Sequence, residues 1–289
     1  MNNEILPKLY LCGTPIGNLG DITFRAAETL RKVEKIYCED TRNTMKLLSA
    51  LDIKKPLESC HEHNERQRAA QIAAEVRSGK AVAFVSDAGM PGVSDPGSRL
   101  VSEFIREGLP FEVVPGPSAV LTAWVASGLP TERLYFVGFL PRTGAERTEA
   151  IARIIRSDAT SAVYESPLRV GATLSELRDA LRSLAEGEQE RPCALVRELT
   201  KTFEECIRGS VSELADRFAE EPPRGECVLL IGGADDELRR EAALGKLDRL
   251  LSDLLGEGLS VKTAVRIASE TLDLPKNLVY KRATEPKNE

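Results

Sequence analysis

The sequence predicts an α/β protein with two α/β lobes, the first on a mainly parallel sheet and the second on a mixed sheet, followed by a small C-terminal helical domain. Three observations support this fold class. Strand-like apolar runs alternate with segments of helical spacing in the first part of the chain, strand-like runs adjoin one another in the second part, and helical spacing alone fills the end. We expect domains at residues 1–115, 116–234 and 235–289.

The first lobe is predicted by four strand-like runs with helices between them. The runs are LPKLYLC (6–12), KIYCE (35–39), KAVAFVSD (80–87) and LPFEVV (109–114). Residues 23–33 and 64–77 place apolar side chains three and four positions apart, opposite charged ones, as amphipathic helices do. This alternation favours parallel strands with helices on the faces of the sheet.

The second lobe is predicted by a further series of strands. These are LYFVGF (134–139), ATSAVYES (159–166), PCALVREL (192–199), TFEECIRG (202–209) and ECVLLIGG (226–233). Only Thr200 and Lys201 separate the third and fourth runs, so we expect an antiparallel hairpin there. Beyond residue 235 the spacing is helical, with Ser260 and Pro275 where helix starts are expected, which resembles a helix-turn-helix extension.

Composition and charge restrict the class of protein. A length of 289 residues with 42% hydrophobic residues is enough for a sizeable core, and the six cysteines form no CxxC pair, so we expect them reduced and buried. We see no signal segment and no apolar stretch of transmembrane length, which indicates a cytoplasmic protein without membrane contact. The net charge of −6 argues against bulk electrostatic coating of nucleic acid, so any RNA contact must be local.

Glycine-rich and proline-rich loops follow three of the predicted strands, where ligands bind in open α/β sheets. The loop at 13–20 is neither a dinucleotide fingerprint, because Pro15 and Asn18 stand where glycines are needed, nor a phosphate-binding P-loop. The loop at 86–97 holds three glycines, two prolines and two aspartates, and the loop at 114–119 repeats the pattern. Glycine permits close approach to a ligand and proline limits the entropy lost on binding, so we expect a binding site here rather than a plain crossover.

These loops, with further segments, resemble the tetrapyrrole methylase superfamily and, within it, the bacterial family that methylates the 2′-oxygen of a cytidine in 16S ribosomal RNA. The matching segments are LCGTPIGNLGDIT (11–23), CEDTRNT (38–44), HEHNE (61–65), SDAGMPGVSDPG (86–97), PGPSA (115–119), FVGFLPR (136–142), YESPLR (164–169) and RELTKTFEE (197–205). Eight segments in order, between about residues 8 and 233, make the resemblance specific. One departure is Ser86-Asp87-Ala88, where many tetrapyrrole-modifying relatives have Gly-Asp-Pro.

The resemblance implies a tetrapyrrole methylase-like fold, S-adenosyl-L-methionine bound between the lobes, and a homodimer. It implies cofactor contacts from Pro15, Asp87, Ala88, Met90, Ser118, Ala119, Tyr164, Glu165, Glu198 and Leu199. The implied substrate is a cytidine ribose in the decoding region of 16S ribosomal RNA, and we expect the acceptor to be the small ribosomal subunit. Two alternatives stay open: a methylase of a tetrapyrrole or other small substrate, or of a modified protein side chain, on the same fold, and a noncatalytic ribosome-assembly factor.

Methyl transfer to a ribose hydroxyl needs positioning together with a base or a cation near the oxygen. The catalytic candidates are Lys201, Glu204 and Glu165, and the candidates for substrate binding are Arg42, Asp95 and Lys201. Each has a structural alternative. Lys201 could be an exposed turn residue, and Arg42 could pair with Glu39 or Asp40. The two glutamates could bind backbone donors, and Asp95, before Pro96, could cap a helix.

Three further features are assigned to structure rather than chemistry. Cys60-His61-Glu62-His63 contains metal-ligating residue types, but its spacing matches no usual zinc site and sulfonium methyl transfer needs no metal, so we expect none. Trp124 lies in an apolar helical segment and is expected in the core rather than as a base-stacking platform. Tyr280, Lys281 and Arg282 are expected to form a solvated helix end, with RNA contact as the alternative.

Overall fold

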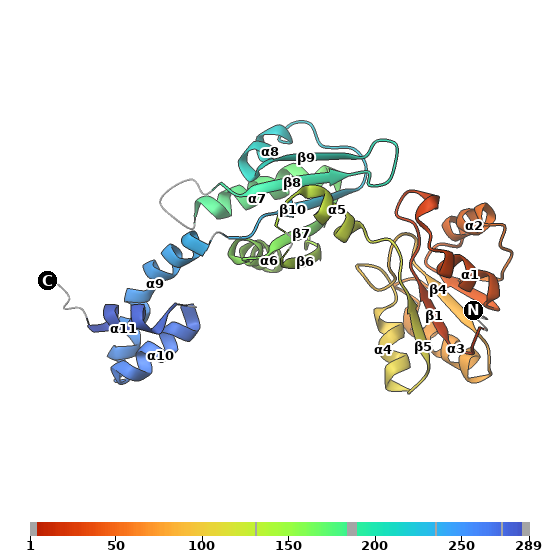
Figure 1. Ribbon diagram of the computed structural model, residues 1–289, viewed down its shortest axis with the longest axis horizontal. Coiled ribbons are helices and arrows are strands. Elements are labelled where there is room, and N and C mark those ends of the chain that lie inside the picture. Colours follow the sequence, from red (N-terminus) through yellow and green to blue (C-terminus); the bar gives the residue numbers. More distant parts are fainter. Residues whose placement is uncertain (1–4, 131, 184–189, 235, 273, 285–289) are drawn as a thin grey trace.

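The computed structural model describes residues 5–130, 132–183, 190–234, 236–272 and 274–284. Along the chain it forms a parallel sheet, a mixed sheet and a group of helices (Figure 1). The first lobe and the helical group lie at opposite ends of the molecule, with the mixed sheet between them (Figure 1). The predicted fold class is confirmed.

The first sheet has five strands in the order β3-β2-β4-β1-β5, and every neighbouring pair is parallel. Its strands are β1 (Leu9–Cys12), β2 (Lys35–Cys38), β3 (Leu57–Ser59), β4 (Val82–Val85) and β5 (Phe111–Val114). The strands β4, β1 and β5 are neighbours, so the loops that follow them all begin at the carboxyl ends of the strands, on the same side of the sheet. Strand β3 is absent from the sequence prediction because its residues are only partly buried and none is β-branched.

Helices cover both faces of the first sheet. They are the 3-10 helix η1 (Leu19–Asp21) and the α-helices α1 (Phe24–Lys32), α2 (Thr41–Ala50), α3 (Glu65–Arg77) and α4 (Ser98–Arg106). Leu9 and Leu11 of β1 pack into the core formed with α3 and α4, whereas Tyr10 and Cys12 pack into the core formed with α1 and α2. Burial of both faces explains why the strands read as continuous apolar runs. Helices α1 and α3 confirm the two predicted helices.

The second sheet has the order β6-β7-β10-β8-β9, with β6 and β7 parallel and the other neighbours antiparallel. Its strands are β6 (Leu134–Phe139), β7 (Thr160–Glu165), β8 (Pro192–Arg197), β9 (Glu205–Ser210) and β10 (Cys227–Ile231). Its helices are α5 (Ala119–Ser127), α6 (Ala145–Arg156), α7 (Pro167–Arg182) and α8 (Val211–Arg217). Helix α5 packs on one face through Val120 and Ala123, and the other three helices share a core with the opposite face.

The predicted antiparallel hairpin is confirmed, but its predicted turn is too short. Arg197 pairs with Glu205 as the last pair of β8 and β9, so residues 198–204 form the connection. Glu198 and Thr200 in this turn have positive φ angles of 51° and 64°. Such angles are unusual for residues other than glycine and end the strand before Leu199.

The C-terminal helices are α9 (Asp236–Gly256), α10 (Val261–Leu272) and α11 (Lys276–Thr284). They share their own core, which includes Leu247, Val265 and Val279. Helices α10 and α11 begin directly after Ser260 and Pro275, as the sequence predicts, and the Ser260 hydroxyl accepts the Thr263 N–H at 3.3 Å. Among the described helices, none has the length and apolarity needed to cross a membrane.

The predictions for cysteine and tryptophan are also confirmed. All six cysteines are free thiols, and all except the partly exposed Cys206 are buried. Trp124 packs against the core between α5 and the second sheet, and its indole N–H donates to the Pro130 carbonyl at 3.0 Å. The five buried cysteines and Trp124 therefore belong to the packed interior, and Cys206 is the exception.

Candidate functional site

The three loops rich in glycine and proline converge at the carboxyl edge of the first sheet. Thr14 and Gly89 exchange two backbone hydrogen bonds, of 2.9 and 3.1 Å, which join the first loop to the second. A Cβ on Gly13 would lie 2.7 Å from both the Gly116 Cα and the Met90 Sδ. Only glycine allows this contact, and the first and third loops touch backbone to backbone because of it.

One contact packs the second lobe on these loops, and a second contact inside that lobe fixes the start of α5. A Cβ on Gly17 would lie 2.7 Å from the Lys201 Cγ and 2.8 Å from the Leu199 carbonyl, so the first loop packs directly on the turn between β8 and β9. The Tyr164 hydroxyl on β7 accepts the Val120 N–H at 3.2 Å, at the start of α5. The Gly17 contact thus joins the two lobes, and the Tyr164 contact fixes the start of α5 against β7 beside the same cavity.

This cavity has a volume of about 620 Å³ and its wall contains residues of both lobes. That size is within the range of small-molecule and cofactor sites. Apolar side chains such as Ile16, Leu199 and Val228 form much of the wall, and the acidic residues Asp95 and Glu226 join them. An apolar wall with a few acidic groups fits a ligand that combines an aromatic base with a positive centre.

The structure brings most of the predicted site residues together. The cavity wall contains Ala88, Met90, Asp95, Ser118, Ala119, Tyr164, Glu165, Glu198, Leu199 and Lys201. Pro15, Asp87, Arg42 and Glu204 lie outside the wall. Ser118 precedes α5 but its side chain makes no capping hydrogen bond, so its hydroxyl is available to a ligand.

Asp87 holds two loops together instead of lining the cavity. Its carboxylate accepts the Asp40 backbone N–H at 3.1 Å and the Asn43 amide at 2.9 Å, which ties the start of α2 to the loop at 86–97. Arg42 forms an ion pair with Asp40 at 2.6 Å, the structural alternative considered for it, and its hydrogen bonds lower the pKa of Asp40 to about 2. The Arg42 side chain is nevertheless 86% exposed. Pro15 lies one residue before Ile16, which does line the cavity.

Lys201 lies between two carboxylates in the turn after β8. Its Nζ is 2.8 Å from the Glu198 Oε1 and 2.8 Å from the Glu226 Oε2. Partial burial acts to lower the pKa of Lys201, but the hydrogen bonds to the two glutamates outweigh it and raise the pKa above its usual value. Lys201 is therefore a fixed cation at neutral pH and unsuited to act as a base. Glu204 accepts the Thr200 N–H at 2.5 Å, which fixes the turn.

Both carboxylate oxygens of Glu165 accept hydrogen bonds inside the protein. Its Oε1 accepts the Ser166 N–H at 2.8 Å and the Arg169 Nε at 2.7 Å, and its Oε2 accepts the Thr173 hydroxyl at 2.8 Å. None of the Glu165 side chain is exposed. This geometry matches the structural alternative, in which Glu165 binds a backbone donor and fixes the start of α7.

Asp95 has the properties of a base close to neutral pH. Burial first, and then the negative charge of Glu39, raise the pKa of Asp95 to about 6, although a hydrogen bond from Ser86 opposes the shift. The suggestion that Asp95 caps the next helix is wrong. The residue before α4 is Gly97, and the Gly97 and Leu100 N–H groups are bound by Glu65, at 2.9 and 3.1 Å. Asp95 is left facing the cavity.

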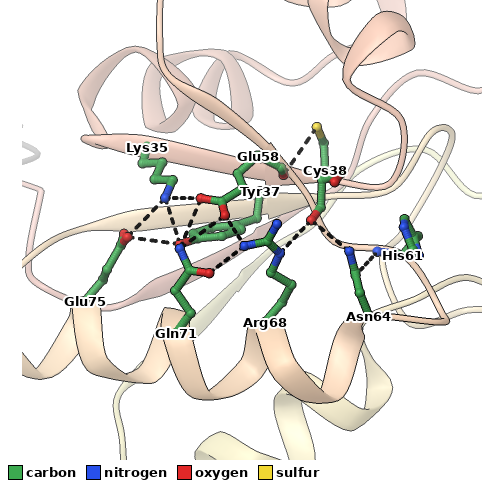
Figure 2. Close-up of polar contacts among 10 residues, drawn as sticks. Lys35, Tyr37, Cys38, Glu58, His61, Asn64, Arg68, Gln71 and Glu75 are labelled. Carbon is green, nitrogen blue, oxygen red and sulfur yellow. Dashed lines mark hydrogen bonds and ion pairs between the residues drawn. The ribbon is translucent and has the colours of Figure 1, made fainter.

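A polar network fixes the segment between β3 and α3 (Figure 2). The Ser59 carbonyl accepts the Arg68 Nε at 3.0 Å and the Asn64 amide at 3.3 Å, and the Asn64 side-chain oxygen accepts the His61 N–H at 2.8 Å. Arg68 also pairs with Glu58 (Figure 2). Within the described ranges, no group of three or more ligating side chains is arranged to hold a metal ion.

Backbone strain is concentrated near the cavity. Of the residues other than glycine with positive φ, Ser94 and Glu198 are part of its wall, at 61° and 51°. Strained backbone at such places is typical of functional sites. The wall also includes Val93, Ser94, Phe139 and residues 225–228, which the sequence did not identify. The FVGFLPR segment was a signal for Phe139, because Gly138 interrupts a strand.

Comparison with known proteins gives one consistent family. The model of tetrapyrrole (corrin/porphyrin) methylases matches residues 8–215, and the model named RsmI C-terminal HTH domain matches residues 241–287. Proteins named ribosomal RNA small subunit methyltransferase I match along nearly the whole chain. The one from Mesorhizobium japonicum is 41% identical, with 98% of this chain and 93% of that protein covered. The one from Micromonospora olivasterospora is 40% identical, with 95% and 85% covered.

A shorter relative and two solved structures complete the comparison. Ribosomal RNA small subunit methyltransferase I of Thermotoga maritima is 45% identical over 79% of this chain and 99% of its own length. The cobalt precorrin-4 methyltransferase of cobalamin biosynthesis has a TM-score of 0.59 at 19% identity, covering 78% of this chain and 95% of that one. Uroporphyrin-III C-methyltransferase from Thermus thermophilus, complexed with S-adenosylhomocysteine, has a TM-score of 0.55 at 22% identity, covering 81% and 99%.

These matches confirm the prediction of a methyltransferase that depends on S-adenosylmethionine. The chain belongs to the tetrapyrrole methylase family and, within it, to the family of ribosomal RNA small subunit methyltransferase I.

Proposed function

We propose that this protein methylates the ribose 2′-oxygen of a cytidine in the decoding region of 16S ribosomal RNA, with the small ribosomal subunit as acceptor. The observation that carries the proposal is a cavity shared by both lobes whose wall contains Asp95, a carboxyl group whose burial raises its pKa to about 6. The names of the relatives, which are 38–45% identical, support small-subunit ribosomal RNA as the substrate.

The residues of the cavity fit the cofactor. Leu199 and Val228 offer an apolar surface for an adenine ring, and Ser118, at the start of α5, offers a hydroxyl and a helix N-terminus for a carboxylate. Met90 is part of the same wall and lies where the loops of the first lobe meet. When bound, S-adenosylmethionine supplies an electrophilic methyl group on a positively charged sulfur.

Asp95 is the base in this proposal. A ribose hydroxyl becomes a good nucleophile only as its proton leaves, and a base with a pKa near the working pH accepts that proton most effectively. The ionised Asp95 carboxylate takes the proton of the 2′-hydroxyl while the carbon–oxygen bond forms and the carbon–sulfur bond breaks. Its negative charge also favours a cation in the cavity before the reaction.

Lys201 supplies positive charge to the cavity from the turn after β8. Its side chain is 30% exposed and its ammonium group is oriented by Glu198 and Glu226, so it can reach a phosphate or ribose oxygen of the acceptor without a large loss of side-chain freedom. Glu204 fixes the turn that carries Lys201, and Glu165 fixes the opposite wall. The exposed Arg42 is a contact for the RNA backbone outside the cavity.

The protein is proposed to act in the cytoplasm as a homodimer. Exposed apolar side chains support a protein partner: Leu121 and Val125 on α5 are 52% and 74% exposed, and Val113 on the edge strand β5 is 47% exposed. An apolar surface at a sheet edge is a common site of self-association. Light scattering of the purified protein measures this directly, with a mass near 63 kDa expected for two copies of the 31.6 kDa chain.

The test of the function is methyl mapping on purified components. Small subunits from cells lacking the gene are incubated with the protein and labelled S-adenosylmethionine, and the modified nucleotide and its methylated atom are identified. The proposal predicts one 2′-O-methylcytidine in the decoding region, formed faster on subunits than on protein-free RNA. If the protein methylates a tetrapyrrole or a protein side chain and not RNA, the proposed substrate is wrong. If it does not bind S-adenosylmethionine at millimolar concentration, the alternative of a noncatalytic ribosome-assembly factor is favoured.

A further inference from the structure

Phe139 is an exposed aromatic residue in the wall of the cavity. Its side chain is 60% exposed at the end of β6, in a chain with only 5% aromatic residues. The Phe139 ring packs against a neighbouring aromatic side chain. It makes an edge contact with Tyr164, with ring centres 5.6 Å apart, and the Tyr164 hydroxyl is itself bound to the Val120 N–H. The Phe139 ring thus packs at the cavity through one edge contact while most of its surface stays accessible.

A β-bulge directs Phe139 to this position. In a regular strand Phe136 and Phe139 would face opposite sides of the sheet, because side chains alternate. The pairing of β6 with β7 shifts between Phe136 and Gly138, and both phenylalanines then contact Tyr164, at 5.1 and 5.6 Å. Bulges often re-aim a side chain beside an active site.

The bulge depends on Gly138. This residue has φ of +73°, and a Cβ added to it would lie 3.0 Å from the Ser94 hydroxyl of the first lobe. Glycine therefore allows both the turn of the backbone and its close approach to the loop that carries Asp95. The negative charge of Asp95 is close enough to Tyr164 to contribute to the raised pKa of that phenol, after the larger effect of burial. Phe139 and Asp95 thus lie near the same tyrosine.

We propose that Phe139 is the platform on which the base of the acceptor nucleotide stacks, so that its ribose lies beside Asp95. The inference rests on the function proposed above and names the group that recognises the substrate. Enzymes that modify nucleotides take the target out of the helix and stack its base on aromatic side chains, and every base has a flat face for such contact. The cofactor adenine is assigned to the apolar wall near Leu199 and Val228, which leaves the exposed ring for the acceptor.

The test compares ring-containing and ringless side chains at this position. Phe139→Ala and Phe139→Leu are expected to raise the KM for small subunits, or to lower kcat/KM, by about 10-fold to 100-fold, while Phe139→Tyr stays within about threefold of wild type. The affinity for S-adenosylhomocysteine, measured by calorimetry, is expected to be unchanged in all three. Ile105→Ala serves as a control, because Ile105 on α4 is 64% exposed and does not line the cavity.

A modified substrate tests the stacking contact itself. Subunits assembled with an abasic ribose at the acceptor position should be methylated more slowly by the wild-type enzyme. On these subunits the Phe139→Ala variant should be as active as the wild-type enzyme. Three results would overturn the proposal: a Leu variant as active as wild type, a parallel loss of cofactor affinity in Phe139→Ala, or an added loss on the abasic substrate. A wild-type protein that does not methylate RNA at all overturns the proposed function together with this inference, whereas RNA methylation untouched by Phe139→Ala overturns the inference alone.

Discussion

Glu65 at the start of α3 binds Gly97 at the start of α4: its buried carboxylate accepts the Gly97 N–H at 2.9 Å, and the same oxygen accepts the Leu100 N–H at 3.1 Å. Negative charge is favourable at a helix N-terminus. Because the loop at 86–97 ends at this contact, the HEHNE segment determines where Asp95 and Met90 lie. A motif distant from the cavity thus positions its wall.

Replacing Glu65 by alanine should loosen the loop that ends at Gly97. The change leaves buried N–H groups without an acceptor, so we expect a loss of about 1–3 kcal/mol in the free energy of unfolding and weaker binding of S-adenosylhomocysteine. Glu65→Gln retains the accepting oxygen and should lose less than half as much. Urea unfolding and calorimetry measure the two effects. Equal losses in the two variants would show that the hydrogen bonds are not what holds the loop.

The pH dependence of the reaction should report Asp95. Its folded pKa is raised from the ordinary value of 3.8 to about 6, and only the ionised form accepts a proton. The rate kcat/KM should therefore be constant above about pH 7 and fall about tenfold per pH unit below about pH 6. Asp95→Asn should lower kcat by about 10²-fold to 10⁴-fold while S-adenosylhomocysteine still binds. An Asn variant with the same pH profile as wild type would exclude Asp95 as the base.

Lys201 should matter for substrate binding more than for stability. Lys201→Met removes the cation and leaves Glu198 and Glu226 facing each other, so the KM for small subunits should rise about 10-fold to 100-fold. The ion pairs of Lys201 with Glu198 and Glu226 are partly exposed, so the free energy of unfolding should change by less than about 1 kcal/mol. Lys201→Arg keeps the charge and should recover most of the affinity. If the Met variant binds subunits as well as wild type does, Lys201 is only a turn residue.

Gly17→Ala should separate the two lobes. Its Cβ would lie 2.7 Å from the Lys201 Cγ and 2.8 Å from the Leu199 carbonyl, and the backbone carbonyl cannot move aside cheaply. We expect a loss of about 1–3 kcal/mol in stability and about tenfold weaker binding of S-adenosylhomocysteine. Gly245→Ala on α9 is the matched control, since nothing lies within 4 Å of its added Cβ. Normal cofactor affinity in Gly17→Ala would show that this contact does not shape the cavity.

Local pattern in the sequence was sufficient for most of the fold. Strands buried on both faces and helices with one apolar face have clear periodicity, which is why α1, α3 and the strands of both sheets could be predicted. Strand β3 could not, because a short edge strand with partly buried residues carries little pattern. The turn between β8 and β9 was predicted too short because positive φ angles at Glu198 and Thr200 are not visible in residue type.

The site was predictable as loops but not as side-chain geometry. Loop composition and resemblance located Met90, Ser118 and Leu199, which the structure brings into one wall. The different environments of Asp87 and Asp95 depend on tertiary contacts, with Asn43 for the first and with the charge of Glu39 for the second. Phe139 was missed for a similar reason, since strict alternation gives no hint of a bulge at Val137.

A crystal structure of the protein with S-adenosylhomocysteine tests the central claim most directly. The ligand is predicted to fill the cavity between the two lobes, with its sulfur between Met90 and Asp95 and its adenine against Leu199 and Val228. Electron density for the ligand at any other place, or a cavity that stays closed to it at saturating concentration, would contradict the account.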